Sequence, residues 1–516
     1  MSHEVELKFR IPAARLAAVR RAVATASARP LALAARYMET ADGDLARARV
    51  ALRLRQEGDS WVQTLKAEGR VALQRLEHNV VLAAAGPQAA HTPPGLDIAR
   101  HDGSPAGARL REVLAGARNA TLREHYATQV QRTWRHVRHQ GAVIELALDE
   151  GEIRAGGLVL PVCEIEFELI QGDTPALLDL AARWSARFGL WLDVRSKSER
   201  GHALAHQARQ AEALAAPPGA GLAVSPPTKA RRLTLESGCS ARAAVAAMLG
   251  EGLQQSLANA SQIADGQWQP EHLHQLRVGL RRLRTVLRLY RTLLPGLDAP
   301  LAAAVAQLFT RLSQARDRDV RAGWLWPALQ AAGAPALAQP EPAAGSADLP
   351  ALLCAADTQA LWLRLLALSL PASAALGTDA TTDATTQPLR DTLARALRHL
   401  LRQVRRDAQA FATLDDAARH RLRRRIKRLR YATELSVSLW PARPLARFVD
   451  ALQAAQGPLG ELNDAVVAAA HCRALAAQQP EAWFAVGWLA ARHDAAVAAC
   501  TEPMAALAEL RGPWAR

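Results

Sequence analysis

The stretch Glu4-Val5-Glu6-Leu7-Lys8-Phe9 near the start of the chain alternates ionised and apolar side chains without a break. Successive residues of a β-strand point to opposite faces. Glu4, Glu6 and Lys8 therefore share one face of a predicted strand, and the three apolar residues share the other. The pattern predicts a strand that buries its apolar face and presents a row of charges on the opposite face.

The same alternation returns later in the first 200 residues. In Glu164-Ile165-Glu166-Phe167-Glu168-Leu169, three glutamates oppose three apolar residues. Arg53 with Arg55, Arg75 with Glu77, and Glu145 with Asp149 share faces in the same way. The predicted strands are 4–11, 51–56, 61–66, 74–82, 128–140, 142–149 and 162–170, with turns at 57–59, 150–152 and 155–157 and helices at 14–24 and 175–188. This mixture predicts an α+β domain built on an antiparallel sheet or barrel.

The density of charge on these strands favours an enclosed cavity. An ordinary sheet with one solvated side explains any single strand, but carboxylates about 6–7 Å apart along a strand repel one another unless a cation lies between them. A solvated face would also carry Ser, Thr and Gln. We therefore expect a barrel with a polar lumen, in which acidic residues bind hard divalent cations and basic residues bind a highly charged anion.

Lysine usage points to the same part of the chain. Only five of the 64 basic residues are lysine, and Lys8, Lys66 and Lys197 all lie in the first 200 residues. Lysines that persist in such an arginine-rich chain indicate sites that need a compact ammonium group.

Length, charge and cysteine content limit the class of protein. The 516 residues predict two to four domains, and of the formal net charge of +15, +4 falls in residues 1–219 and +11 in residues 220–516. The second part is expected to bind a polyanion. The five scattered cysteines indicate a reducing compartment and argue against a zinc site or a disulfide framework. Because no signal-peptide pattern and no apolar run of about 18 residues occurs, we expect a cytoplasmic protein without a membrane span.

The second part of the chain has helical periodicity. Residues 215–227 (AAPPGAGLAVSPP) predict a linker, and beyond it Ala, Leu and Arg recur at a spacing of 3.6 residues. Residues 331–350 and 371–388, rich in Ala, Pro, Gly and Thr, are predicted loops inside this all-α part.

An internal repeat divides this helical part. Residues 274–284 (HQLRVGLRRLR) match 420–430 (HRLRRRIKRLR) at an offset of 146 residues, and 312–317 (LSQARD) match 459–464 (LGELND) at an offset of 147. Two matches in the same order predict a duplicated helical bundle.

Each repeat carries a basic stripe on one helix. The first stripe is His274, Arg277, Arg281, Arg284, Arg288 and Arg291, and the second is His420, Arg423, Lys427 and Arg430. The predicted buried stripes are Leu276, Leu280, Leu283 and Leu287, and Leu422, Ile426 and Leu429. Like charges four residues apart destabilise a helix by about 0.2–0.5 kcal/mol. A solvated face explains one such helix, whereas two matching copies favour a bound anion. A metal site there is not expected, since His272 and His274 point to different sides of a helix.

The N-terminal residues resemble the CYTH superfamily, the triphosphate tunnel metalloenzymes. Its signature Glu-x-Glu-x-Lys matches residues 4–8, and further motifs follow in order through about residue 205. These are 37–40 (YMET, where the family usually has Asp in place of Glu39), 52–55 (LRLR), 64–66 (TLK), 75–77 (RLE), 149–151 (DEG), 164–169 (EIEFEL) and 197–201 (KSERG). The resemblance implies an eight-stranded antiparallel tunnel.

The resemblance also implies roles for the charged residues. The basic residues that would clasp a triphosphate are Lys8, Arg53, Arg55, Lys66, Arg75, Arg132 and Lys197. The acidic residues that would hold two Mg²⁺ or Mn²⁺ ions or orient water are Glu4, Glu6, Glu77, Asp149, Glu164, Glu166 and Glu168. Arg123 is an alternative to Arg132, and strand parity leaves open which two of Glu164, Glu166 and Glu168 contact metal.

The expected reaction is metal-assisted hydrolysis of tripolyphosphate to diphosphate and phosphate. Lys and Arg would stabilise charge on the phosphoryl oxygens, and no protein base is predicted. The alternatives are thiamine triphosphatase or adenylyl cyclase activity in the same tunnel, and a non-catalytic polyphosphate-binding protein.

The two helical repeats resemble the CHAD domain, the conserved histidine α-helical domain, over about residues 229–510. Besides the basic stripes, its hallmarks are 316–320 (RDRDV), Tyr431 and 459–464 (LGELND). The resemblance implies binding of long-chain polyphosphate by His274, Arg277, Arg281, Arg284, Arg288, His420, Arg423, Lys427 and Arg430. Nucleic acid is the rival polyanion, but only Tyr290 and Tyr431 interleave the stripes for base stacking.

The sequence thus predicts a tunnel domain over residues 1–205, a linker over 206–228 and an all-α duplicated bundle over 229–516, with repeats at 229–330 and 385–510. The expected partners are inorganic triphosphate and long-chain polyphosphate, without a membrane or nucleic acid. The oligomeric state is not predicted.

Overall fold

The computed structural model describes residues 4–58, 60–68, 74–82, 93–213, 225–235, 238–338, 348–370 and 389–514, without the side chains of 4, 68, 74–75, 213 and 314–322. The chain forms two compact units. The first comprises Met1–Thr228, Leu257–His272 and Leu349–Ser373, and the second comprises Lys229–Ser256, Leu273–Asp348 and Ala374–Arg516. Two stretches of the helical part therefore belong to the unit that contains the sheet.

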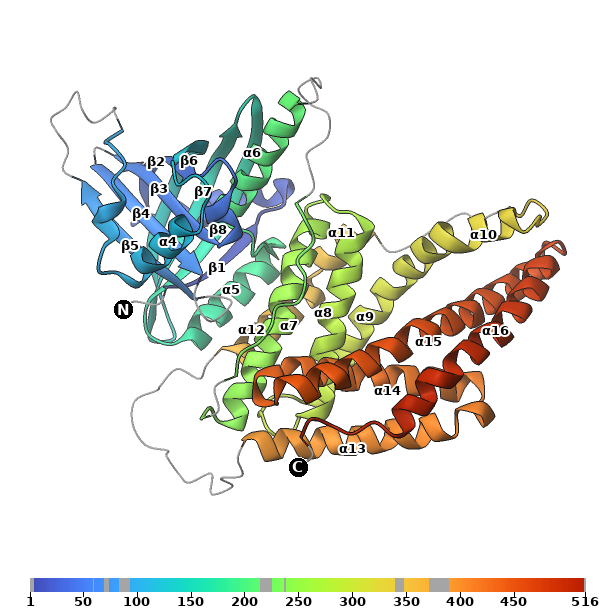
Figure 1. Cartoon of the computed structure of the whole chain (residues 1–516). Coiled ribbons are helices and arrows are strands. Elements are labelled where there is room, and N and C mark those ends of the chain that lie inside the picture. The colour runs from blue at the N-terminus through green and yellow to red at the C-terminus, as the bar shows by residue number, and fades with distance from the viewer. Residues whose placement is uncertain are drawn as a thin grey trace. The chain divides into compact units, whose positions relative to one another are not determined.

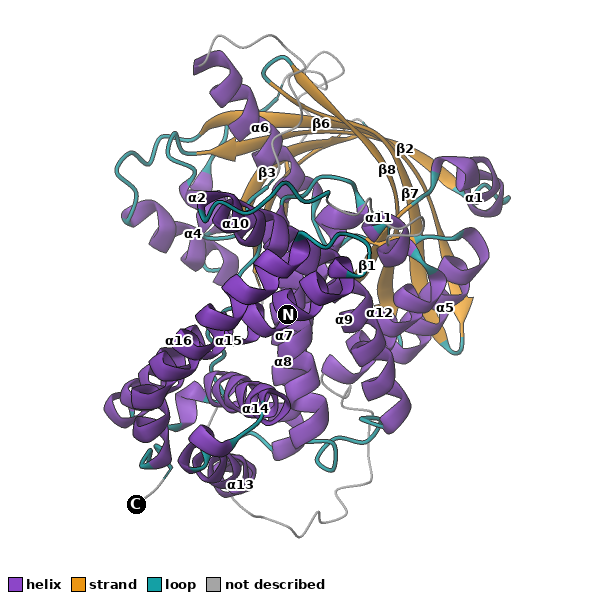
Figure 2. Ribbon diagram, turned by 90° about the vertical axis from the view of Figure 1, so that its right-hand side faces the viewer, coloured by secondary structure: helices purple, strands orange, loops and turns teal. Residues whose placement is uncertain are grey.

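The first unit is built on one antiparallel sheet (Figures 1 and 2). Its strands are β1 (Glu4–Arg10), β2 (Arg29–Glu39), β3 (Val50–Glu57), β4 (Ser60–Glu68), β5 (Gln74–Leu82), β6 (Arg123–His139), β7 (Ala142–Ala155), β8 (Leu158–Gln171) and β9 (Trp191–Leu192). They lie in the order β5-β4-β3-β2-β6-β7-β8-β1-β9. Figure 2 shows the long strands β6, β7 and β8 curving together.

The first eight strands of this order run from β5 to β1, and these two strands also pair with each other. Strand β1 pairs with β8 from Glu6↔Glu168 to Arg10↔Glu164, and it pairs with β5 only at Glu4↔Arg75 and Val5↔Gln74. The predicted tunnel is therefore joined by two residue pairs at this seam rather than by a full ladder. The two-residue strand β9 pairs with the end of β1 and makes a ninth strand.

Several predicted boundaries were wrong. Strand β7 runs through residues 150–152, where we predicted a turn. Gly151 fits there because a Cβ would lie 2.0 Å from the carbonyl oxygen of Gln129 on β6, so the glycine marks a close approach of two strands. Strand β2 was missed, since its sequence RPLALAARYME lacks alternating charge.

Helices cover both faces of the sheet. They are α1 (Leu16–Val23), α2 (Asp44–Arg47), α4 (Pro105–Ala115), α5 (Thr174–Phe188) and α6 (Lys197–Ala213), with 3₁₀ turns η1 (Ala13–Arg15) and η2 (Ile98–His101). Helix α5 packs on the apolar face, where Phe167 meets Phe9 and Trp184 with ring centroids 5.7 and 5.9 Å apart. This is the face opposite Glu166 and Lys8, so the charged side chains lie on the other side.

Helix α6 packs on the charged face of the sheet, at one end. Its Leu204 and Ala205 share a core cluster with Val130, Ile153 and Val162. These three strand residues have the same parity as Arg132, Asp149 and Glu164, respectively. The apolar residues of the helix therefore cover one end of the charged face. Lys197, its first residue, lies where these apolar contacts give way to the charged side chains.

The described part of the second stretch of the chain is helical. The helices are α7 (Ala241–Ala264), α8 (Pro270–Leu289), α9 (Ala299–Val320), α10 (Trp326–Ala331), α11 (Leu349–Cys354), α12 (Ala356–Ser369), α13 (Leu389–Gln409), α14 (Asp416–Leu435), α15 (Ala442–Ala476) and α16 (Ala482–Ala508). A π-helical segment, η3 (Arg321–Leu325), follows α9, and two 3₁₀ turns are η4 (Phe411–Thr413) and η5 (Val437–Leu439). Figure 1 shows α15 and α16 side by side. Among the described residues, no helix has the length and apolar character needed to cross a membrane.

The repeat is visible in the helix bounds. Helices α8 and α14 each have 20 residues, and both their first and last residues differ by the offset of 146. The predicted apolar stripes are buried in both helices, and Leu276, Leu283, Leu422 and Leu429 are each 0% exposed. The predicted loop at 371–388 lies outside the described residues.

Candidate functional site

The charged face of the sheet is organised in rows that run across neighbouring strands. In one row, Glu6 of β1 stands opposite Glu168 of β8, which stands opposite Glu145 of β7. In another row, Glu164 of β8 lies between Arg10 of β1 and Asp149 of β7, and Asp149 faces Arg132 of β6. The strand register alone therefore places three acids side by side in one row, and two acids flanked by two arginines in the other.

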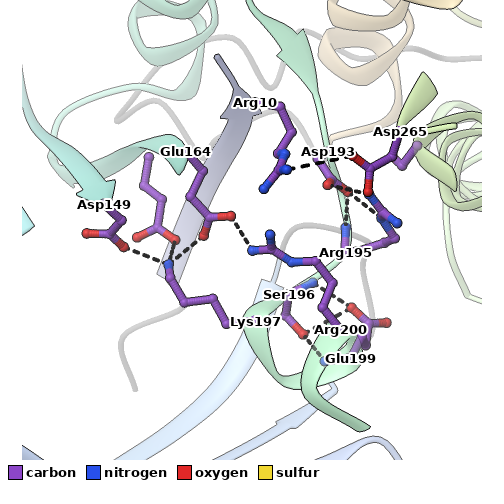
Figure 3. A network of polar contacts seen from close by, with 12 residues as sticks. Arg10, Asp149, Glu164, Asp193, Arg195, Ser196, Lys197, Glu199, Arg200 and Asp265 are labelled. Atoms are coloured by element: carbon purple, nitrogen blue, oxygen red, sulfur yellow. Dashed lines mark hydrogen bonds and ion pairs between the residues drawn. The ribbon is translucent and has the colours of Figure 1, made fainter. Parts of the chain in front are cut away.

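Lys197 lies at the centre of an acidic cluster (Figure 3). Its Nζ is 2.6 Å from Asp149 Oδ2, 2.5 Å from Glu164 Oε1 and 2.8 Å from Glu166 Oε1. Asp149 and Glu164 are 0% exposed, so these charges are removed from water. Burial lowers the pKa of Lys197, but the three carboxylates outweigh it and hold that pKa well above its usual range.

Two arginines complete the neutralisation of this cluster. Arg132 donates from Nε and Nη2 to the two carboxylate oxygens of Asp149, both at 2.7 Å, and also contacts Glu166. Arg200 of α6 pairs with Glu164. Burial raises the pKa of Glu166, but Lys197 and Arg132 outweigh it and hold that pKa well below its ordinary value. Each carboxylate of the cluster therefore has a basic partner within the protein.

The row of three acids is compensated at one end, where Arg132 Nη1 and His136 Nε2 lie 3.8 and 3.7 Å from the carboxylate of Glu145. Burial, followed by the negative charges of Glu145 and Glu6, raises the pKa of Glu168 to about 7. Glu77 of β5 adds to this shift and Lys66 of β4 opposes it. Like charges directly opposite on adjacent strands are destabilising. This row is thus the part of the charged face that most needs an additional cation.

Basic residues from β3 and β4 also contact polar partners on neighbouring strands. Arg53 donates from Nη1 to Tyr37 Oη at 3.1 Å, and Lys66 Nζ lies 2.7 Å from Glu77 Oε2. Burial lowers the pKa of Arg55, and the charge of Arg53 lowers it further. The buried Nε atoms of both arginines have no hydrogen-bond partner among the described residues. They are donors still available to an anion.

The contacts of the segment Lys197-Ser-Glu-Arg-Gly201 explain why four of its five residue types are needed. Ser198 accepts a hydrogen bond from Tyr126 Oη at 2.9 Å, and Lys197 and Arg200 reach the acidic cluster as described. A Cβ on Gly201 would lie 2.2 Å from the Tyr126 ring. The segment therefore seats one turn of α6 on Tyr126 and aims two cations at Glu164.

The structure brings most of the predicted residues of the tunnel site together. The residues that belong to the rows and contacts given above, or share their strand faces, are Lys8, Arg53, Arg55, Lys66, Arg132, Lys197, Glu6, Glu77, Asp149, Glu164, Glu166 and Glu168. The side chains of Glu4 and Arg75 lie outside the described residues. Arg132 lies in the acidic cluster, whereas its alternative Arg123 is exposed at the start of β6.

Sequence reasoning left three residues of this site out of its ligand sets. Strand parity had already placed Glu145 on the same face as Asp149, but no role was assigned to it. Arg200 lies within the quoted 197–201 motif. Tyr37 also lay in a quoted motif, but its contact with Arg53 depends on the pairing of β2 with β3, and β2 was missed.

The second unit gathers the two basic stripes on α8 and α14. Burial lowers the pKa of Lys427 to about 6, and the charges of Arg423 and Arg281 lower it further. Burial likewise lowers the pKa of Arg284, to which Arg424 and Arg281 add. Side chains of α8 and α14 thus repel one another, so the two stripes face a common region. His420 of the second stripe contacts Asn463 of α15, both of them predicted hallmarks.

Comparison with known proteins identifies both parts of the chain. Residues 2–201 match the family model of the CYTH domain, and residues 247–473 match that of the CHAD domain. An inorganic triphosphatase from Haemophilus influenzae is 30% identical over 173 residues, which cover 33% of this chain and 44% of that relative. The alignment therefore spans less than half the length of that protein.

Solved structures are similar to each part. The CHAD domain from the plant Ricinus communis is 29% identical with a TM-score of 0.46, covering 56% of this chain and 99% of that one. A candidate adenylyl cyclase from Hippeastrum with a dominant triphosphatase activity is 19% identical with a TM-score of 0.29, covering 38% and 94%. Matched in this order by the two family models, the chain contains a CYTH domain followed by a CHAD domain.

Proposed function

We propose that this chain is a divalent-metal-dependent inorganic triphosphatase that hydrolyses tripolyphosphate to diphosphate and phosphate. The observation that supports this most directly is the row Glu6–Glu168–Glu145, where three carboxylates stand opposite one another and the pKa of the central Glu168 is raised. Oxygen-rich acidic sites suit Mg²⁺ and Mn²⁺. An anionic substrate alone would worsen the repulsion, whereas a metal–triphosphate complex would relieve it.

The same row would hold the metal. Glu6, Glu145 and Glu168, with Glu77 nearby, supply oxygen donors of the kind that these ions prefer. A bound divalent ion would offset phosphate charge and lower the pKa of a bound water. Asp149, Glu164 and Glu166 also offer oxygens within 4.8 Å of one another, but a metal there would compete with Lys197.

The protein's own cations would bind and orient the phosphates. Arg53 and Arg55 carry buried donors without a partner among the described residues, and phosphate oxygens would supply one. Lys197 and Arg132 are held in fixed positions by the acidic cluster. Fixed cations stabilise charge on phosphoryl oxygens without reorganising during the reaction. The acidic cluster would thus act mainly by positioning these two bases.

The test is phosphate release from tripolyphosphate, ATP and thiamine triphosphate, each with Mg²⁺, Mn²⁺ or neither. We expect tripolyphosphate to be the best substrate and turnover to require metal. Lys8→Ala and Glu6→Ala should abolish turnover, whereas the exposed Lys229→Ala should not. Preference for thiamine triphosphate, cyclic AMP production from ATP, or no turnover of any substrate would contradict the proposal.

The helical unit is proposed to bind long-chain polyphosphate along α8 and α14. One polyphosphate chain bound between the two basic stripes would offset the positive charge of both and so relieve their mutual repulsion. Tyr290 and Tyr431 are 1% and 4% exposed, so neither can stack on a nucleobase. Binding of long polyphosphate and of single-stranded RNA, measured over a salt series, tests this proposal. Arg281→Ala should weaken polyphosphate binding. Arg402→Ala, which replaces an exposed arginine of α13, should not. Tighter RNA binding would contradict it.

We also place the protein in the cytoplasm. The five cysteines form no disulfide within the described part of the chain, as is usual for proteins of a reducing compartment.

A further inference from the structure

Two buried polar side chains hold the backbone that leads into Lys197. Residues 192–195 connect β9 to α6. The Leu192 N–H donates to Gln359 Oε1 at 2.8 Å, and the Val194 N–H donates to Ser261 Oγ at 3.2 Å. Gln359 on α12 is 3% exposed and Ser261 on α7 is 1% exposed. Both belong to the compact unit that contains the sheet. The stretch before α6 is thus fixed by residues far along the chain.

An ion-pair network holds the same stretch by charge (Figure 3). Asp193 is fully buried, and its N–H donates to the carbonyl oxygen of Lys8 at 3.0 Å. Arg195 donates to both carboxylate oxygens of Asp193, at 2.9 and 2.8 Å. Asp265, directly after α7, accepts from Arg195 Nη2 at 2.8 Å and lies 3.7 Å from Arg10 Nη2. Asp265 therefore joins two cations that flank Lys8 and Lys197.

The charge of Asp265 is needed because few other acids are close. The side chains of Arg195 and Arg10 are only 10% and 16% exposed. Asp193 is already bidentate with Arg195. The cross-strand partner of Arg10 is Glu164, which is already paired with Lys197 and Arg200. Without Asp265, a buried Arg10 would compete for that carboxylate and disturb the cluster around Lys197.

We propose that Asp265 is a positioning residue for the triphosphate site, acting with Ser261 and Gln359. It anchors Arg195 and keeps Arg10 away from Glu164, so that Glu164 holds Lys197 and Arg200 in place. All three residues lie beyond the CYTH match, at 2–201, and within the CHAD match, at 247–473. The site of the tunnel domain is thus completed by the other matched region. The inference rests on the proposed triphosphatase function.

The first test compares full-length Asp265→Asn, which removes only the charge, with Asp265→Glu, which keeps it. Displacing Lys197 should lower kcat/KM for tripolyphosphate roughly ten- to hundredfold in Asp265→Asn. Asp265→Glu should stay much closer to the wild type because the carboxylate remains. Asp42→Asn removes an exposed charge from the same unit and should leave the kinetics unchanged. Equal kinetics in Asp265→Asn and the wild type would overturn the proposal.

Hydrogen exchange provides a readout that does not depend on activity. In Asp265→Asn, and in Ser261→Ala if the first variant folds poorly, the amides of residues 192–200 should exchange faster while those of β6 and β7 stay protected. Faster exchange spread evenly over the sheet, or none at residues 192–200, would overturn the positioning role. If the wild type hydrolyses no triphosphate, the proposed function fails, whereas the exchange experiment still decides whether Asp265 positions this segment.

Discussion

Replacing Lys197 with Met tests whether the acidic cluster depends on its central cation. Lys197 contacts three carboxylates within 2.8 Å, and two of them, Asp149 and Glu164, are fully buried. Removing one member of a buried ion pair costs roughly 3–5 kcal/mol, because the remaining charge has no partner. Arg132 and Arg200 still compensate part of the cluster, so we expect a loss in the unfolding free energy near the lower end of that range.

The loss should depend on pH with a defined sign. The pKa of Glu166 is held well below its ordinary value in the folded protein, against the opposing effect of burial, by Lys197 and Arg132. Its contribution to stability is therefore present above the unfolded pKa of about 4.3 and is lost as the pH falls through the folded pKa. Lys197→Met raises the folded pKa, so the wild type and the variant should differ most at pH 7 and converge in acid.

Urea denaturation of the full chain at pH 7 and pH 4 measures the effect. Lys229→Met, which replaces an exposed lysine, is the matched control and should leave the unfolding free energy unchanged. Addition of Mg²⁺ or Mn²⁺ should recover part of the stability of Lys197→Met, since Asp149, Glu164 and Glu166 could then bind the ion. A variant as stable as the wild type at pH 7 would refute the electrostatic reasoning.

Three further changes test other parts of the molecule. Glu168→Gln should stabilise the metal-free protein at pH 8 by roughly 1 kcal/mol after solvent screening, but not at pH 4. The reason is that the folded pKa of Glu168 is about 7, so the wild type loses stability as the pH rises from about 4.3 to 7. Equal melting temperatures of variant and wild type at pH 8 would contradict this. Gly201→Ala should cost about 1–3 kcal/mol of unfolding free energy, because the new Cβ would lie 2.2 Å from the Tyr126 ring; unchanged urea denaturation would contradict it. Lys427, whose pKa is lowered to about 6, should take up close to one proton when polyphosphate binds at pH 8, measured by calorimetry in buffers of different ionisation enthalpy. Binding without proton uptake would contradict that reasoning.

Strand parity predicted the charged face well because it is a local property. Alternation in residues 4–9 and 164–169 fixes which side chains share a face, whatever the strands pair with. The same holds for the helical repeats, where residues three and four apart must lie on one stripe, and the offset of 146 is reproduced by the bounds of α8 and α14. Turn signals were less reliable. Gly151 resembles a turn in sequence, but it serves the close approach of β6 and β7.

The sequence by itself determined that one sheet has a charged and an apolar face, that a helical repeat follows, and which residues belong to each stripe. Only the tertiary structure decided how charges are paired: Lys197 with Asp149, Glu164 and Glu166, and Glu168 with Glu6 and Glu145 in a row of like charge. It also brought Asp265, in the turn after α7 and 68 residues beyond Lys197, into contact with Arg195. The physical reason is that the periodicity of a strand or helix decides which of its own residues share a face. The strength of each charge interaction, by contrast, depends on register, burial and distance between segments far apart in sequence.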